Sequence, residues 1–358
     1  MSKRLLIVTP SFPPEGSGAA QYYAELVAEV PEHLEVHLLT TWTGKEITGS
    51  SIHFHPALPS VVRSFFLIRI LLLPLWTFFW ILFFRLRKKI DVVQVHSSTA
   101  ITLGVVFASI TLGIPIVYDV QDMQAPLWLL RFGRKPKYLT VGEAVTQRIR
   151  DMGIAEARIL EISSLVPSTL PKDLPRRESN QFIFVGSLLK KAKGLDVLIE
   201  AMRAIGKTNT ACQLKIIGTG KDLKWLQKEI RTDLWLASHI KILGELSHDE
   251  VLREMARSQA LILPSLSEAV PRVIIEAFSL GTPVIATRVG SVPKLIGDNE
   301  RGVLIPTNDA QALEQAMYQM LRHDEVVSGM SDAARKYAQT MPSWADLRRK
   351  IYHFTLGV

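Results

Sequence analysis

Cysteine is almost absent from this 358-residue chain, which holds Cys212 alone. A single thiol excludes an intramolecular disulfide, and no group of cysteines and histidines has the spacing of metal ligands, so we expect no metal site. Both absences favour a reducing compartment, of which the cytosol is the simplest. With an apolar fraction of 47%, a chain of this length is expected to form two α/β domains with proper cores.

Acidic residues are missing from one long segment, between Arg63 and Lys89. Within it, residues 65–84 are almost all apolar, and a helix of this length could span a bilayer. Candidate strands of a single sheet precede and follow the segment, so one crossing would divide a folded domain between the two sides of the membrane. We therefore expect an interfacial helix or bent helical pair in 63–89, whose basic residues meet anionic headgroups. A re-entrant hairpin and a core or dimer-interface helix remain alternatives.

The excess of positive charge, +8 overall, is not arranged as in nucleic-acid-binding proteins. The basic residues are not interleaved with aromatic residues on a recognisable module, so no nucleic acid partner is expected. The apolar residues that follow Met1 are too few for the core of a signal peptide and predict a buried strand instead. We expect a cytoplasmic protein, held peripherally on the inner face of the plasma membrane through 63–89.

Short β-branched segments alternate with helical patterns along the chain, which is typical of βα units in parallel sheets. These segments fall into two series. The first comprises Arg4–Thr9, Glu35–Thr40, Asp91–His96, Ile114–Asp119 and Tyr138–Val141, and the second comprises Gln181–Val185, Gln213–Gly218, Ile240–Leu243, Ala260–Pro264 and Pro283–Thr287. The sequence therefore predicts an α/β protein with two doubly wound, Rossmann-like domains.

The domain boundaries follow from composition. Residues 1–165 are predicted to form the N-terminal domain and residues 181–340 the C-terminal domain. Between them, residues 166–180 are rich in proline, serine and charge, as linkers are. The last residues, 341–358, are predicted to form a helix that packs back on the N-terminal domain. Ligands bind beyond the carboxyl ends of the strands in such sheets, so two facing domains are expected to enclose a central cleft.

The segment 260–287 has the clearest functional pattern. It predicts a strand, a loop, a short helix and a strand, with Pro271 in the first helical turn and Gly281 at the helix end. The amino end of the helix offers N–H groups and a positive dipole to a diphosphate. Glu268 and Glu276 are suited to accept hydrogen bonds from sugar and ribose hydroxyls. Alternatively, Glu268 is a charge that stabilises the helix start, and Glu276 lies on a solvated face.

This segment resembles the retaining family 4 glycosyltransferases of the GT-B fold, whose hallmark is a spaced pair of glutamates. The matching residues are Pro264, Ser265, Glu268, Glu276, Ala277, Gly281, Pro283, Val284, Ile285 and Ala286. The resemblance covers nearly the whole chain. It implies a glycosyltransferase (EC 2.4) that uses a nucleotide-diphosphate sugar as donor substrate, with no cofactor and no metal ion, and the sequence has no Asp-x-Asp metal motif.

The resemblance also implies the donor contacts. The residues implied to bind the nucleotide or its diphosphate are Gly186, Ser187, Lys193, Gly218, Arg272, Val273 and Glu276. Among them, Lys193 would contact the diphosphate together with the amides near Arg272, and Glu276 would hold the ribose hydroxyls. Glu268 would orient the sugar ring.

Gly16 and Gly18 match the family's glycine loop after the first strand, which borders the donor or acceptor. Without the family, Gly-Ser-Gly-Ala-Ala-Gln is a near miss for the dinucleotide fingerprint. The third glycine is missing, and no acidic residue closes the second strand, where Leu38-Leu-Thr-Thr stands. These absences weaken an interpretation as an NAD-dependent oxidoreductase.

Two departures from the family pattern affect the donor side. Ser187 stands where an arginine often contacts the diphosphate, and Lys190, Lys191 or Arg272 are candidates to replace it. Ala269 replaces the glycine that usually follows the first glutamate, and its side chain narrows the geometry of the loop.

A third departure concerns the residues implied to act in catalysis, which are Glu268, His96, Gln121 and Asp122. Gln121 and Asp122 stand where many relatives have a His-Asp pair, whose histidine contacts the transferred sugar. Gln121 can hydrogen-bond a hydroxyl but cannot act as a general acid or base. His96 matches a histidine segment of the family, with a structural role as the alternative.

The acceptor is inferred from the basic, apolar segment in the domain that binds acceptors in GT-B enzymes. It indicates a lipid-linked saccharide or a glycolipid, in envelope or extracellular polysaccharide synthesis. A catalytically weak or inactive GT-B protein that binds sugars or nucleotides is the alternative, because Ser187 and Gln121 each replace a residue that contacts the donor in relatives.

Overall fold

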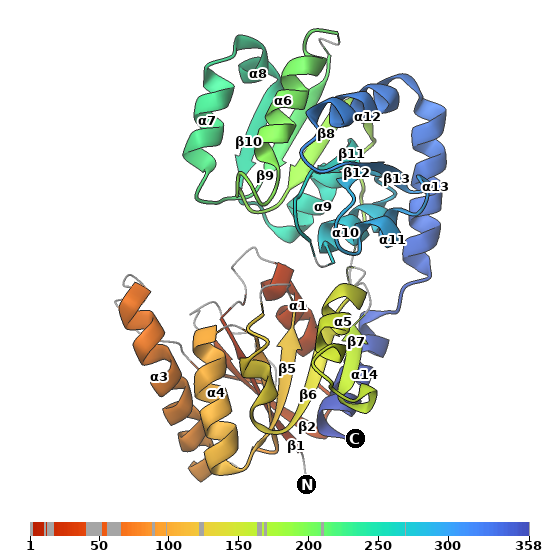
Figure 1. The fold of residues 1–358 in the computed structure, drawn as a ribbon. Coiled ribbons are helices and arrows are strands. Elements are labelled where there is room, and N and C mark those ends of the chain that lie inside the picture. The colour runs from red at the N-terminus through yellow and green to blue at the C-terminus, as the bar shows by residue number, and fades with distance from the viewer. Residues whose placement is uncertain are drawn as a thin grey trace. The chain divides into compact units, whose positions relative to one another are not determined.

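The computed structural model describes residues 3–10, 12, 18–40, 52–55, 66–87, 90–97, 99–121, 125–162, 167, 170–208, 211–268 and 270–357. The chain divides into two compact units (Figure 1). Unit 1 contains Met1–Ser163 together with Trp344–Val358, and unit 2 contains Ser164–Ser343.

Unit 1 is built on a seven-stranded sheet of parallel strands in the order β3-β2-β1-β4-β5-β6-β7. Its strands are β1 (Lys3–Thr9), β2 (Leu34–Thr40), β3 (Ile52–His55), β4 (Val92–His96), β5 (Pro115–Val120), β6 (Arg134–Val141) and β7 (Ile159–Ile162). Its helices are α1 (Gly18–Val27), α3 (Phe66–Arg87), α4 (Thr99–Leu112), η1 (Leu129–Arg131), α5 (Glu143–Arg150), η2 (Glu156–Arg158) and α14 (Trp344–Leu356). The strand order reverses between β1 and β4, and ligands of such sheets bind beyond the carboxyl ends at this point.

Unit 2 has a six-stranded parallel sheet in the order β10-β9-β8-β11-β12-β13. Its strands are β8 (Glu178–Val185), β9 (Gln213–Ile217), β10 (Ile240–Gly244), β11 (Ser258–Leu263), β12 (Val284–Thr287) and β13 (Gly302–Ile305). Its helices are α6 (Leu195–Ile205), α7 (Leu223–Arg231), α8 (Leu234–His239), α9 (His248–Arg257), α10 (Arg272–Leu280), α11 (Val292–Ile296), α12 (Ala310–Arg322) and α13 (Asp324–Gln339). Here the strand order reverses between β8 and β11.

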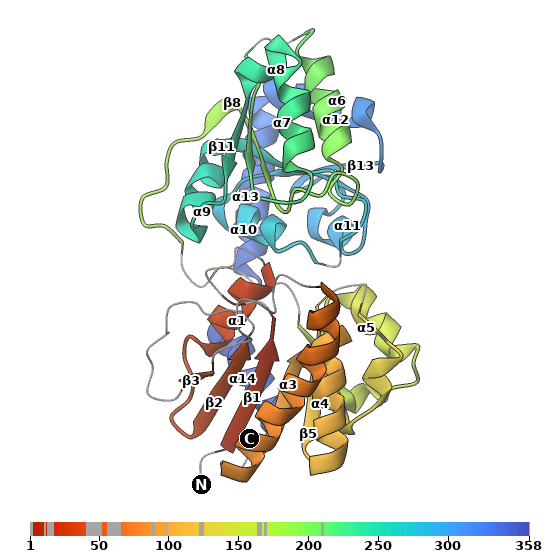
Figure 2. The ribbon, with the colours of Figure 1, turned by 90° about the vertical axis from the view of Figure 1, so that its left-hand side faces the viewer.

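Alternation along the strands of unit 2 divides its core between the two faces of the sheet. Phe182 and Phe184 pack with α6 and α12 on one face, whereas Ile183 packs with α9 and α10 on the other (Figure 2). Helices therefore cover both faces of this sheet, so the polar residues of unit 2 that can contact a ligand lie at the ends of the strands.

The apolar segment of unit 1 forms one continuous helix, α3, with Pro74 inside it. It lies beside α4, and the two helices approach closely where a Cβ on Gly104 would be 2.2 Å from the carbonyl oxygen of Pro74 (Figures 1 and 2). None of the described helices is both long enough and apolar enough to cross a membrane.

The last helix, α14, belongs to unit 1. The hydroxyl of Tyr352 donates to the carbonyl oxygen of Leu26 in α1 at 2.8 Å, and Lys3 Nζ donates to the carbonyl oxygen of Leu356 at 2.7 Å. These bonds attach the end of the chain to its first strand and first helix.

Most strands lie where the sequence predicts them, and the differences have local reasons. The sequence analysis did not identify β3, β7 and β13, which have four residues each and show too little alternation to stand out. Strand β8 begins at Glu178, inside the segment predicted as a linker, because Glu178–Asn180 are polar and exposed although their backbone is paired.

Candidate functional site

The predicted donor residues of unit 2 gather beyond the carboxyl ends of β8 and β11, where the strand order reverses. The loop after β8 contacts the loop after β11. Gly194 has φ +63°, and a Cβ at this position would be 2.0 Å from the carbonyl oxygen of Pro264. The amide of Leu266 donates to the carbonyl oxygen of Ala192 at 2.9 Å, which fixes the two loops to each other.

This contact brings Lys193 and Glu268 together. Lys193 Nζ lies 2.5 Å from Glu268 Oε1, and both side chains are mostly buried, with 21% and 12% of their surface exposed. The lysine predicted to bind phosphate and the glutamate predicted to orient a sugar therefore form one ion pair. The alternative role of Glu268, a lone charge that stabilises the start of a helix, does not account for this pairing.

Helix α10 starts at Arg272, four residues after Glu268, and ends at Leu280, where it is capped by Gly281, which has φ +71°. Its capping position is Pro271, whose side chain has no hydrogen-bond acceptor, so no side chain at that position competes with an anionic ligand for the amides of the first turn. Val273 lies in that turn, and its side chain is half-buried. Glu276 is only 9% exposed, so the alternative that places it on a solvated face is wrong.

The two glycines of the predicted nucleotide site also meet. Gly218 has φ +133°, and a Cβ there would be 2.0 Å from the carbonyl oxygen of Gly186. The amide of Gly218 donates to the carbonyl oxygen of Gly244 at 2.7 Å, so the ends of β8, β9 and β10 are joined. The resulting edge is lined by backbone, which allows a flat ligand to approach closely.

The candidates to replace the missing arginine differ in their surroundings. Ser187 is exposed. Lys190 Nζ lies 4.2 Å above the ring centre of Trp225, and Lys191 Nζ forms an ion pair with Asp196 at 2.8 Å. Arg272 is the candidate that stands on α10, the helix that carries Glu276.

In unit 1, His96 and Gln121 gather around a residue that the sequence analysis did not select, Asp119. Gln121 Nε2 donates to Asp119 Oδ1 at 3.3 Å, and the hydroxyl of Tyr23 donates to Asp119 Oδ2 at 3.0 Å. His96 Nδ1 lies 3.4 Å from the same hydroxyl. Gln94 Nε2 donates to Asp119 Oδ2 at 3.1 Å. This polar cluster lies at the carboxyl ends of β4 and β5.

The electrostatics of the cluster follow from burial. Asp119 is fully buried, and desolvation raises its pKa from 3.8 to about 6, although the hydrogen bonds from Tyr23, Gln121 and Gln94 oppose the rise. Desolvation and the charge of Asp119 raise the pKa of Tyr23 well above 10. One signal in the sequence could have revealed Asp119: it is a carboxylate inside the apolar segment Pro115–Val120.

Two predicted residues, Gly16 and Asp122, lie outside the described residues. Gly18 is described and is the first residue of α1. No group of histidine, cysteine, aspartate or glutamate side chains in the described ranges could hold a metal ion.

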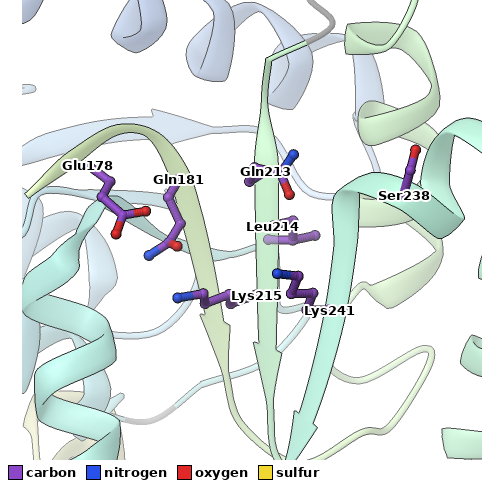
Figure 3. Close-up of a pocket in the computed structure, with 7 residues that line it drawn as sticks. All are labelled: Glu178, Gln181, Gln213, Leu214, Lys215, Ser238 and Lys241. Carbon is purple, nitrogen blue, oxygen red and sulfur yellow. The ribbon is translucent and has the colours of Figure 1, made fainter.

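A depression of about 540 Å³ lies at the opposite edge of the sheet of unit 2 (Figure 3). Gln181, Lys215 and Lys241 line it from the amino-terminal parts of neighbouring strands. Lys215 Nζ is already paired with Glu254 at 2.5 Å. The depression is therefore separate from the donor residues.

Comparison with protein families matches almost the whole chain. The model of "Glycosyltransferase Family 4" matches residues 16–167, and the model of "Glycosyl transferases group 1" matches residues 168–337. The boundary between the two matches lies close to the boundary between units 1 and 2.

Two curated relatives match part of the chain. An uncharacterized glycosyltransferase of Methanocaldococcus jannaschii is 31% identical over 174 residues, which are 48% of this chain and 47% of the relative. The amylovoran biosynthesis glycosyltransferase AmsK of Erwinia amylovora is 32% identical over 158 residues, which are 42% of this chain and 39% of the relative. The chain thus spans less than half the length of each of these relatives.

Among solved structures, HepE of Anabaena in complex with UDP and glucose superimposes with a TM-score of 0.74 over 99% of both chains, at 17% identity. At this identity the likeness shows the fold, which has two Rossmann-like units. Together with the matches to both family models, it leads to one assignment: the chain belongs to the group 1 glycosyltransferases of family 4, which have the GT-B fold.

Proposed function

We propose that the protein transfers a sugar, with retention of configuration, from a nucleotide-diphosphate sugar to a lipid-linked saccharide or glycolipid at the cytoplasmic face of the membrane. The observation that supports the donor most strongly is the ion pair of Lys193 and Glu268, which lies beside the helix that buries Glu276. A sugar nucleotide offers hydroxyls to both carboxylates and phosphate to the lysine, so one ligand satisfies all three side chains.

In this proposal each group binds a different part of the donor. Glu276 accepts hydrogen bonds from the ribose, Glu268 accepts them from the sugar ring, and Lys193 shifts its charge from Glu268 toward the diphosphate. The first-turn amides of α10 and Arg272 complete the diphosphate contacts. Negative charge grows on the departing diphosphate in the transition state, where Lys193 and the helix dipole stabilise it without a metal ion.

The acceptor side of the proposal is supported by an exposed apolar face on α3 and α4. Phe79 of α3 is 61% exposed and Phe107 of α4 is 57% exposed. Among the side chains of the two helices whose burial is described, the other large apolar ones that are exposed are Leu72, Leu75, Phe83, Leu86, Leu103 and Ile110. The opposite side of α3, with Leu73, Ile81 and Phe84, is buried in the core.

Charge favours a lipid surface as the partner of this apolar face. Neither α3 nor α4 contains an acidic residue, and Arg85 and Arg87 stand in the last turn of α3. An apolar face bordered by basic residues is suited to an anionic membrane interface, where the acyl boundary takes the aromatic rings and the headgroups take the arginines. A membrane-bound acceptor domain would then meet a lipid-linked acceptor in the plane of the membrane.

The donor assignment is tested with a panel of UDP-, GDP- and dTDP-sugars and purified protein. We expect one class to raise the midpoint of thermal unfolding, since a ligand at about 100 times its Kd stabilises the folded state by about 2.7 kcal/mol. HepE binds UDP and glucose, so UDP-sugars are the first choice. Transfer is then measured on a polyprenyl-diphosphate saccharide in vesicles.

The outcomes separate the candidate functions. Stabilisation together with transfer supports the enzyme. Stabilisation without transfer supports the alternative, a catalytically weak or inactive binding protein, for which Gln121 and Ser187 are the observations in favour. If no sugar nucleotide stabilises the protein, the donor site is wrongly assigned.

A further inference from the structure

Asp119 is a fully buried carboxylate, and its hydrogen-bonding partners in the described part of the chain are neutral side chains. Tyr23, Gln94 and Gln121 donate to it from α1, β4 and the residues after β5. A buried charge that relies on neutral donors is costly to keep. Perturbed titratable groups of this kind are concentrated at functional sites.

An ionised carboxylate only accepts hydrogen bonds, so Asp119 fixes which atoms of its neighbours point toward it. Gln121 must turn its NH₂ group to Asp119 Oδ1, which directs its carbonyl oxygen to the other side. Gln121 is half-buried, so a ligand can reach this side chain.

Through Tyr23, Asp119 also determines which nitrogen of His96 carries the proton. The hydroxyl of Tyr23 has one proton, which it donates to Asp119 Oδ2. Its oxygen can then only accept from His96 Nδ1, at 3.4 Å, so the proton of a neutral His96 sits on Nδ1 and Nε2 is the acceptor nitrogen. His96 and Asp119 are also direct neighbours in the β4–β5 pairing.

We infer that Asp119 is a positioning residue that sets the hydrogen-bond polarity of Gln121 and His96, so that both present acceptors to the hydroxyl groups of a sugar. This inference rests on the proposed function for the identity of the ligand. It also explains how glutamine serves at the position where the family resemblance implies a contact with the transferred sugar. With its oxygen fixed outward, Gln121 accepts a hydroxyl proton in a defined direction.

Protonation of Asp119 would reverse this arrangement, because a neutral carboxyl group donates one hydrogen bond. Burial places the pKa of Asp119 at about 6, so the carboxylate form dominates at neutral pH and is lost below it. Among the residues that the structure describes, the titratable groups that face it are Tyr22 and Tyr23 from α1 and His96 from β4.

The test is a pair of compensating substitutions. In Asp119→Asn, the one side-chain oxygen of the asparagine accepts from Tyr23 and Gln94, so its NH₂ group faces Gln121. The side chain of Gln121 must then turn its carbonyl oxygen toward residue 119 and its NH₂ group toward the ligand. We expect kcat/KM for transfer to fall about 10- to 100-fold, while the Kd of UDP stays unchanged because its proposed contacts lie in unit 2. Adding Gln121→Glu gives residue 121 two carboxylate oxygens, one that accepts from the NH₂ group of residue 119 and one that faces the ligand as an acceptor. In this double variant, kcat/KM should return to within about threefold of the wild type.

Gln121→Glu alone is the matched control. It sets two carboxylates against each other, one of which must take up a proton, so activity should be low at pH 8 and recover toward pH 6. A merely structural role would give no rescue in the double variant. Wild-type activity in Asp119→Asn, or a double variant that remains as impaired as Asp119→Asn, overturns the inference.

A second measurement does not depend on turnover. With ¹⁵N-labelled glutamine, the side-chain amide resonances of Gln121 should shift with a midpoint near pH 6 in the wild type and lose that shift in Asp119→Asn. If the wild type transfers no sugar but this titration is present, the proposed function fails and the polarity assignment stands. If the titration is absent, the assignment fails whether or not the protein is active.

Discussion

Lys193 and Glu268 form an ion pair of 2.5 Å between the loop after β8 and the loop after β11, although they are far apart in sequence. In the absence of a ligand, the two side chains neutralise each other. In the proposed site, a donor would therefore bind by exchange: its phosphate would pair with Lys193, and its sugar hydroxyls would donate to Glu268.

Lys193→Ala should lower transfer by about 10²- to 10³-fold, because it removes the cation proposed to stabilise the departing diphosphate. Lys336→Ala is the control, since Lys336 is exposed on α13 and has no proposed role at the donor site. Steady-state kinetics of both variants with the preferred donor check this. Equal losses in both would mean that the effect is general electrostatics and not contact with the diphosphate.

Glu276→Gln should weaken donor binding by about 10- to 100-fold, because a neutral amide replaces the charged group proposed to accept hydrogen bonds from the ribose hydroxyls. The substitution keeps the volume of a side chain that is only 9% exposed, so α10 should remain folded. Calorimetric titration with UDP measures the effect. A donor affinity that matches the wild type would remove Glu276 from the site.

Gly194→Ala should destabilise unit 2 by about 1–3 kcal/mol, because it combines a positive φ with a contact to the backbone of Pro264. Gly329→Ala is the matched control. Gly329 lies inside α13 with open space around it, so alanine there should stabilise by about 0.5–1 kcal/mol. Urea unfolding of the two variants should give changes in the free energy of unfolding of opposite sign. A Gly194→Ala variant as stable as the wild type would contradict the close approach of the two loops.

The fold was largely predictable from sequence, whereas the roles of the donor residues remain predictions. Strand periodicity gave the two α/β units, and the spacing in 260–287 gave the helix between β11 and β12. The ion pair of Lys193 and Glu268 could not be predicted, since it depends on a loop crossing that Gly194 makes possible.

Asp119 shows a different limit of sequence reasoning. A strand buried on both faces is expected to be apolar, so the carboxylate inside it stands out, but the sequence shows only one nearby partner, Gln121. The other partners, Tyr23 and Gln94, come from α1 and β4, which only the folded sheet brings together. The apolar residues of α3 posed the reverse problem, because composition could not separate those that face the core from those that remain exposed.

Asp119 should also make stability depend on pH. Its pKa is raised by burial to about 6 in the folded state, compared with 3.8, so its contribution is complete below about pH 4 and is lost as the pH rises through 6. The free energy of unfolding of the wild type, relative to Asp119→Asn, should therefore be roughly 1 kcal/mol larger at pH 5 than at pH 7. Urea titrations at both pH values measure it, and a difference that is constant or of opposite sign contradicts the raised pKa.

The exposed face of α3 and α4 should bind anionic vesicles. Replacing Phe79 and Phe107 together by glutamate removes apolar area and adds repulsion from the headgroups, so the fraction that floats with phosphatidylglycerol vesicles should fall at least about tenfold. Leu234→Glu is the control, because Leu234 is 90% exposed on α8 of unit 2 and does not belong to the face of α3 and α4. Binding to neutral vesicles should be weaker than binding to anionic ones, since Arg85 and Arg87 stand at the end of α3.

Two outcomes would contradict this prediction. Flotation of the double variant at wild-type levels would show that α3 and α4 do not carry the membrane contact. If the wild type is a dimer and the double variant is not, the exposed face belongs to an interface with a second copy of the chain.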